Sequence, residues 1–180
     1  MAIRRFDIDA LLPLLGNGFT LLTPNNAGVD GILREYASGY RSSPEKAKTW
    51  ERPAVFAIDI YIQQLWQLAA SQAIAPFNEM QLLGRFDEQE TWLQIVRSSH
   101  EKYPLLNSEE TANSAARSYR FFQQWDVAAS SETERYRGAA DFQTFLDWSE
   151  QFKARCKKIN AVSLSDASRV IAKHIEEIKP

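Results

Sequence analysis

The stretch that decides the fold is Phe19–Tyr36, with the sequence FTLLTPNNAGVDGILREY. Its first residues, Phe19–Leu22, form a short apolar run that predicts a strand covered on both faces. Pro24 ends this strand, and Asn25 and Asn26 can cap a helix by accepting backbone N–H bonds. The apolar stripe of that helix contains Val29, Ile32, Leu33 and Tyr36. We therefore expect a helix N-terminus at the carboxyl end of a strand, where phosphates and other anions are commonly held.

A second strand and helix follow the same plan. The apolar run Ala54–Ile58 predicts another buried strand, and Asp59 can cap a helix whose inward residues are Ile62, Leu65, Trp66 and Ala69. Two strands joined by a helix in this way pair in parallel, so segments 19–23 and 54–58 should be neighbours. An amphipathic helix that begins at Asp7 or Asp9 and ends at Gly16-Asn17-Gly18 precedes them.

Only helices are predicted after this β-α-β-α unit. Asp87 and Glu90 fit a capping box that opens one helix, and Ser108 opens the next. Ser131 with Glu134 suits a short capped turn. A long helix is marked by Phe142, Phe145, Leu146, Ser149, Phe152 and Cys156, and Ser163 or Ser165 caps the last one. We expect a helix-rich α/β protein with a β-α-β-α unit over residues 1–75 and an all-helical subdomain over residues 76–180.

Composition limits the classes of function. The 180 residues are 44% hydrophobic and 24% charged, as in ordinary globular proteins. A formal net charge of -2 argues against a strong non-specific polyanion binder, so nucleic acid would need a local patch. The single cysteine, Cys156, excludes an internal disulfide and predicts a reducing, cytoplasmic setting. No apolar run approaches the roughly 18 residues of a membrane span, so we expect no membrane partner.

Residues that could carry catalysis or hold a metal are scattered. A glycine-rich phosphate loop followed by Lys-Ser/Thr is absent from the sequence, which argues against an ATPase. His100, His174 and Cys156 fall at no metal-ligand spacing, so neither a metal nor a cofactor is expected. His174 lies on an apolar stripe and suits a core or edge position, and for Cys156 a buried structural thiol is favoured despite its basic neighbours. An enzyme is therefore the least favoured class.

Two basic groupings remain as candidates for phosphate contacts. One follows the central unit and contains Arg34, Arg41, Lys46 and Lys48. The other lies near the end of the long helix, where cations also stabilise the helix dipole, and contains Lys153, Arg155, Lys157 and Lys158. For each grouping a solvated face is the favoured interpretation, and contact with a nucleic-acid backbone is the alternative.

The order of elements resembles a known family. LLTPNNAGVDGILREY resembles the strand, Thr-x-Thr-Asn-like turn and helix of superfamily 1 helicases, and PAVFAIDIYIQQLW resembles their next strand and helix. Three later segments resemble the helical insertion of RecB/AddB-type proteins: LLGRFDEQETWLQIV, FLDWSEQFKARCKK and DASRVIAKHIEEI. As a whole, the chain resembles the N-terminal part of a bacterial family of "probable DNA repair proteins", which join a degenerate helicase-like region to a RecB-type nuclease.

The resemblance implies an inactivated, partly RecA-like module that guides DNA or docks downstream nuclease domains. It places Thr23, Asn25 and Asn26 at the turn that touches single-stranded DNA in active relatives. The nucleotide-binding loop is missing, and Ala57 and Asp59 replace the threonine and histidine of the second motif. The implied partners are single-stranded or forked DNA and later domains of the same protein. The rival hypothesis is a helical protein-interaction module that binds no nucleic acid.

Overall fold

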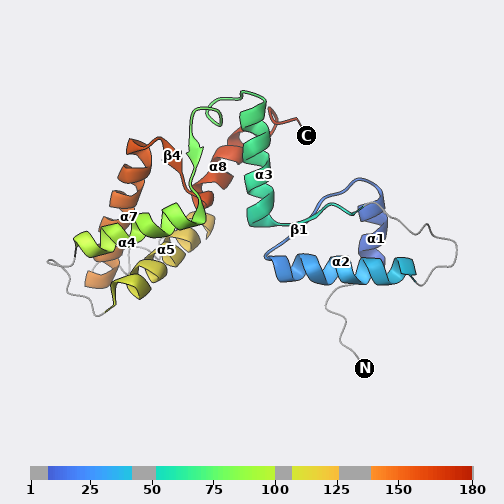
Figure 1. Ribbon diagram of the computed structural model, residues 1–180, viewed down its shortest axis with the longest axis horizontal. Coiled ribbons are helices and arrows are strands. Elements are labelled where there is room, and N and C mark those ends of the chain that lie inside the picture. Colours follow the sequence, from blue (N-terminus) through green and yellow to red (C-terminus); the bar gives the residue numbers. More distant parts are fainter. Residues whose placement is uncertain (1–7, 42–51, 100–106, 126–138, 180) are drawn as a thin grey trace. The chain divides into compact units, whose positions relative to one another are not determined.

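The structure is a computed structural model that describes residues 8–41, 52–99, 107–125 and 139–179 (Figure 1). The chain divides into two compact units, Met1–Gln64 and Leu65–Pro180. This division falls inside a helix, α3 (Ile58–Ser71), and not between residues 75 and 76, where the sequence analysis placed it. The expected helix-rich α/β class is confirmed, because the described residues form mostly helices with two small parallel sheets.

The first unit contains the predicted β-α-β arrangement. Helix α1 (Ile8–Gly16) precedes β1 (Leu21–Thr23), α2 (Asn26–Arg41) connects β1 to β2 (Val55–Ala57), and α3 follows at once. Strands β1 and β2 pair in parallel, with Leu21 opposite Val55 and Thr23 opposite Ala57. The predicted parallel pairing of segments 19–23 and 54–58 is therefore confirmed.

The core of this unit lies between α2 and one face of the sheet. The stripe predicted for α2 does face inward, since Val29, Ile32 and Tyr36 are buried and Leu33 is partly buried. They pack with Leu15, Val55 and Ala57. Asn25 caps α2 as predicted, because its side-chain Oδ1 accepts a hydrogen bond of 3.0 Å from the N–H of Gly28.

The prediction that the first strand is covered on both faces is wrong. Alternate residues of a strand point to opposite faces, and α2 covers only the face that carries Leu21 and Thr23. On the other face Leu22 is 41% exposed. The strand is also shorter than expected, because it begins at Leu21 and leaves Phe19 60% exposed.

The second unit contains most of the helices. Its elements are the rest of α3, β3 (Gln81–Leu82), α4 (Arg85–Ser98), α5 (Ser108–Trp125), α7 (Ala140–Lys158), β4 (Ala161–Val162) and α8 (Leu164–His174). Strands β3 and β4 pair in parallel, with Gln81 opposite Ala161 and Leu82 opposite Val162. The expectation of an all-helical subdomain is corrected by this pair, which is too short to leave a periodic signal in the sequence.

Aromatic rings make the centre of the second core. Trp92 of α4 stacks on Phe152 of α7 with ring centroids 4.5 Å apart, and Tyr119 of α5 meets Phe152 edge-on at 5.2 Å. Such pairs stabilise by roughly 0.5–1.5 kcal/mol beyond the area they bury. Smaller residues such as Ala112 and Ala115 let α4, α5 and α7 approach one another around these rings. The core of this unit therefore lies among three helices, α4, α5 and α7.

Helix starts agree only in part with the predicted caps. Ser163 caps α8 as predicted, since its Oγ accepts a hydrogen bond from the N–H of Asp166. The capping box predicted at Asp87 does not form. Helix α4 begins earlier, at Arg85, and its N-cap residue Gly84 has no side chain to accept a hydrogen bond. Asn107, one residue before the expected Ser108, caps α5, and Asp59 lies inside the first turn of α3. The turn predicted at Ser131 and Glu134 lies outside the described residues, as do Lys46 and Lys48.

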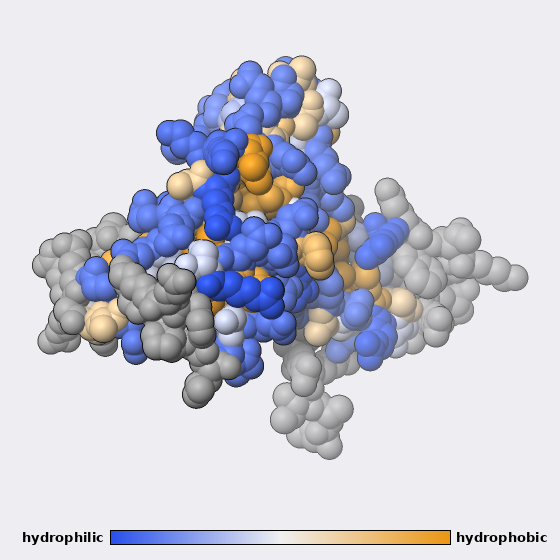
Figure 2. Space-filling view, turned by 60° about the vertical axis from the view of Figure 1, so that its left-hand side comes forward, coloured by the Kyte–Doolittle hydropathy of each residue, from blue (hydrophilic) through white to orange (hydrophobic). Residues whose placement is uncertain are grey.

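Within the described part of the chain, none of the helices is both long and apolar enough to cross a membrane. The space-filling view agrees, because the face that it presents is mostly hydrophilic with apolar side chains between polar ones (Figure 2).

Candidate functional site

The turn between β1 and α2 holds three residues that the sequence analysis assigned to DNA contacts. One of them, Thr23, is only 5% exposed. Its Oγ1 lies 2.9 Å from the carbonyl oxygen of Asn25 and 3.3 Å from that of Phe56. The hydroxyl therefore bonds within the protein, where it ties the turn to β2, and it positions the turn instead of presenting a group to solvent.

The side chains of Asn25 and Asn26 are exposed at the N-terminus of α2. The first N–H groups of a helix have no partner within the helix, and the helix dipole adds partial positive charge there. The N–H of Gly28 is already bonded to Oδ1 of Asn25, so the donors left for a ligand at the carboxyl end of β1 are the exposed side-chain amides of Asn25 and Asn26 and the N–H groups of Asn26 and Ala27. This arrangement can hold a phosphate or another anion.

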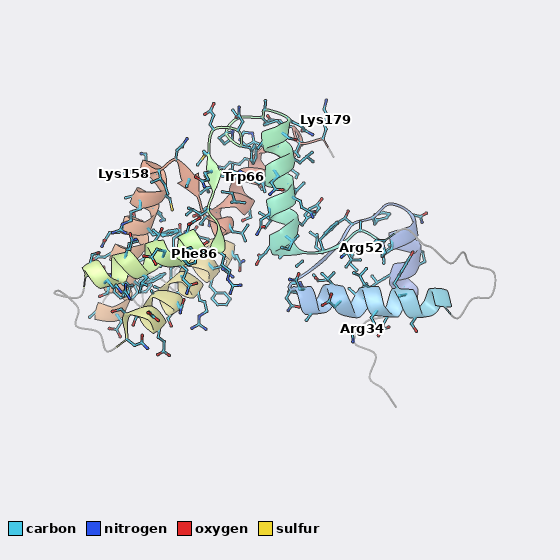
Figure 3. All side chains as sticks on the ribbon, in the orientation of Figure 1. Arg34, Arg52, Trp66, Phe86, Lys158 and Lys179 are labelled. Carbon is cyan, nitrogen blue, oxygen red and sulfur yellow. The ribbon has the colours of Figure 1, made fainter. Side chains whose placement is uncertain are left out.

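The charges around this turn do not all favour an anion. Arg34 is exposed on α2, two turns beyond Asn26 and roughly 12 Å along the helix axis at 1.5 Å per residue (Figure 3). The exposed carboxylate of Asp30 lies between them on the same stripe, at i+4 spacing from each. A phosphate at this turn would therefore depend on neutral N–H and amide donors more than on a nearby cation.

The basic grouping at the end of α7 is spread around the exposed side of that helix. Lys153 lies 3.0 Å from the carboxylate of Glu150, and Arg155 donates a hydrogen bond of 3.2 Å to the side chain of Gln94. Lys157 and Lys158 are exposed in the last turn, where positive charge stabilises the helix dipole. These four residues belong to the second unit, and Arg34 belongs to the first.

The prediction of a buried thiol at Cys156 is confirmed. The side chain is buried in the core of the second unit. Burial, with smaller contributions from the carboxylates of Asp166 and Glu88, raises the pKa of Cys156 to about 11. A thiol with a raised pKa is a poor nucleophile at neutral pH.

His174 lies at the edge of a core, as expected. Its Nδ1 lies 2.9 Å from the carboxylate of Glu177, and its ring meets Phe77 edge-on at 5.6 Å. His100 lies outside the described residues. No group of three or more His, Cys, Asp or Glu side chains within the described ranges is placed to hold a metal ion.

Two features of the second unit were missed from the sequence. The first is a hydrogen-bonded group in which the hydroxyls of Tyr119 and Ser163 both donate to Oδ2 of Asp166, at 2.8 and 2.7 Å. The Ser163-x-x-Asp166 spacing signals a helix cap, but nothing local indicates the distant tyrosine. The second feature is a pair of exposed phenylalanines, Phe86 and Phe121.

No family model, curated protein or solved structure matches this chain. The fold and the site define a helix-rich α/β protein with an exposed junction of strand, turn and helix.

Proposed function

We propose that this chain is a non-catalytic module of a DNA repair or recombination protein, which guides single-stranded or forked DNA or docks nuclease domains that follow it. The observation that supports the proposal is the β1-α2-β2 unit. Its strands pair in parallel as predicted, and α2 begins at the carboxyl end of β1 with Asn25 and Asn26 exposed. This is the arrangement that the resemblance to helicase-like proteins requires.

In this proposal the turn contacts the DNA backbone through N–H and amide groups. Thr23 keeps the turn in place from inside, and Asn25 and Asn26 bind phosphate oxygens from outside. Because Asp30 is close, the chain carries a net charge of -2 and the donors at the turn are neutral, we expect weak binding that falls only gradually with salt. The missing phosphate loop leaves no ATP-driven step for this chain.

The test is fluorescence anisotropy of labelled single-stranded and forked DNA at low and physiological salt. Asn25→Asp keeps an oxygen that can cap α2 but brings a negative charge to the turn, so it should weaken binding at least tenfold, and Asn26→Ala should weaken it less. Asn25→Ser keeps the cap without a charge and separates helix stability from binding. Asn17→Ala removes another exposed amide of the same unit and should have no effect.

Absence of binding by the unaltered chain at low salt would overturn the proposal. Equal binding by Asn25→Asp and the unaltered chain would move the DNA away from this turn.

The second candidate is a protein-interaction module that binds no nucleic acid. One observation favours it: the face of the β1–β2 sheet opposite α2 is open, with Leu22 at 41% exposure and Phe19, Ile58 and Ile60 also exposed in the same unit. Parallel sheets are normally covered on both faces. If another domain covers this face, backbone amides of residues 19–23 should exchange hydrogen more slowly in a longer protein that contains this chain than in the chain alone.

A further inference from the structure

Helices α4 and α5 carry two rings that the core does not use. Phe86, in the first turn of α4, is 78% exposed, and Phe121, in the last turns of α5, is 60% exposed. A scattered exposed apolar residue needs no explanation, but two large rings among arginines do. The aromatic–arginine patch is defined here as Arg85, Phe86, Arg117, Arg120 and Phe121.

The packing of the two helices brings these residues to one end of the pair. Gln89 of α4 is hydrogen-bonded at 3.1 Å to Asn113 of α5, and Arg97, two turns later in α4, lies 3.6 Å from Glu109, earlier in α5. The helices are therefore antiparallel, and the start of α4 lies beside the end of α5, as Figure 1 shows.

The spacing within each helix then places the rings. Phe86, Gln89 and Arg97 share one stripe of α4, along the edge beside α5, and Phe86 is its N-terminal member. On α5, Asn113, Arg117 and Phe121 follow at i+4 spacing and form one stripe. Because Gln89 lies level with Asn113, Phe86 lies level with about Arg117, and Phe121 follows about one turn further along α5.

The charges at this end are mainly positive. Among the residues that the structure describes, Arg85, Arg117 and Arg120 have no carboxylate partner, although Arg117 donates a hydrogen bond to the carbonyl oxygen of Asn113. Arg169 of α8 reaches the same end, since it donates to the carbonyl oxygen of Gln123 at 3.1 Å. Three carboxylates belong to the first turns of α4: Glu88 is buried, and Asp87 and Glu90 oppose the arginines at the surface, where Glu90 accepts a hydrogen bond from Gln94.

We infer that the aromatic–arginine patch binds single-stranded nucleic acid, with bases stacked on Phe86 and Phe121 and phosphates held by Arg85, Arg117 and Arg120. Exposed rings beside guanidinium groups fit a chain that alternates flat bases with negative phosphates. An acidic peptide would satisfy the arginines but would leave the rings without a matching flat surface. The inference rests on the proposed function for the class of ligand, but it uses no residue of the β1–α2 turn.

The test compares two ligands of equal charge: labelled oligo-dT and an abasic oligonucleotide of the same length. Phe86→Ala with Phe121→Ala should weaken oligo-dT binding about 5- to 100-fold for each base whose stacking is lost, and should leave abasic binding nearly unchanged. Arg117→Gln with Arg120→Gln should weaken both ligands and reduce the salt slope by about 0.7 for each phosphate contact removed.

Matched controls come from the same unit. Ile159→Ala with Ile175→Ala removes exposed apolar side chains outside the patch, and Arg97→Gln removes an exposed arginine at the other end of α4. Both should bind like the unaltered chain. Phe86 and Phe121 are exposed, so their variants should keep the melting temperature of the unaltered chain.

Four outcomes overturn the inference: no binding of oligo-dT, no effect of the phenylalanine variants, equal loss for the abasic ligand, or preference for an acidic peptide over oligo-dT of the same charge. Photocrosslinking from 4-thiothymidine, mapped by mass spectrometry, separates this site from the turn. Crosslinks in residues 85–90 and 117–124 support the patch even if Asn25→Asp has no effect. Crosslinks confined to residues 23–30 support the turn and overturn the patch.

Discussion

The side chain of Thr23 packs directly on the backbone of Gly28, so that a Cβ atom added to Gly28 would lie 3.0 Å from Cβ of Thr23. Thr23 is held in this place by the carbonyl oxygens of Asn25 and Phe56. The contact locks the first turn of α2 against the end of β1. It explains why a glycine stands inside a helix at this position.

From this contact we expect Gly28→Ala to destabilise the first unit by about 1 kcal/mol, even though alanine favours helices. Thr23 cannot move away without losing its hydrogen bonds, so the crowding is not relieved. Thermal unfolding followed by circular dichroism measures the change. In the double variant Thr23→Ala/Gly28→Ala the loss should be smaller than the sum of the single losses. An unchanged or higher melting temperature for Gly28→Ala would contradict the close contact.

Asn107 should contribute to stability through the cap of α5. Its Oδ1 accepts hydrogen bonds of 3.1 Å from the N–H groups of Glu109 and Glu110. We expect Asn107→Ala to lower the free energy of unfolding by about 1 kcal/mol in urea titrations, and Asn107→Ser to lower it much less, because serine also caps. Equal losses in the two variants would mean that the cap is not the cause.

The hydroxyl of Tyr119 should contribute to the free energy of unfolding, because it donates a hydrogen bond to the carboxylate of Asp166. Tyr119→Phe keeps the ring against Trp92 and Phe152 and removes the hydroxyl with its hydrogen bond to Asp166. A hydrogen bond to a charged group contributes about 1.5–3 kcal/mol, so we expect a loss of that size in urea unfolding. Tyr61→Phe, which keeps the ring stacked on Phe56 in the other unit, is the comparison, and a loss confined to Tyr61→Phe would contradict the prediction.

Stability should fall in alkaline solution as buried groups resist ionisation. Burial raises the pKa of Cys156 from its ordinary value of 9.0 to about 11. The unfolded thiol therefore ionises first, and its contribution to stability, complete below pH 9, is lost as the pH rises from about 9 to 11. The loss should approach about 2–3 kcal/mol for two pKa units. Tyr119, whose pKa is also raised, adds to the fall from about pH 10 upward.

The measurement for this prediction is the urea midpoint from pH 7 to 11. Cys156→Ala should flatten the slope between pH 9 and 10, and Cys156→Ala/Tyr119→Phe should flatten it further. The thiol should also react slowly with a chromogenic disulfide at pH 8 unless urea is added. A fast reaction without urea, or an alkaline slope that the double variant does not change, would contradict the buried position of Cys156.

The sequence by itself determined the local features of this protein. The apolar stripe from Val29 to Tyr36, the cap at Asn25 and the cap at Ser163 all form as predicted, because each depends on residues within one or two helical turns. The parallel pairing of β1 with β2 was also predictable, because a strand-helix-strand connection allows few arrangements. The role of Asn25 and Asn26 as contact residues came from the resemblance and stays a prediction.

Only the tertiary structure decided the features that join distant segments. The pairing of β3 with β4 involves two residues on each side, and neither strand has a pattern of its own. Thr23, a candidate contact from the sequence, turned inward because the carbonyl of Phe56 lies beside it in the folded sheet. Phe121 lies on the side of α5 opposite its buried residues, and only the antiparallel packing of α4 and α5 brings this end of α5 beside the exposed Phe86. Periodicity shows which face of a helix is apolar, but burial depends on what packs against that face.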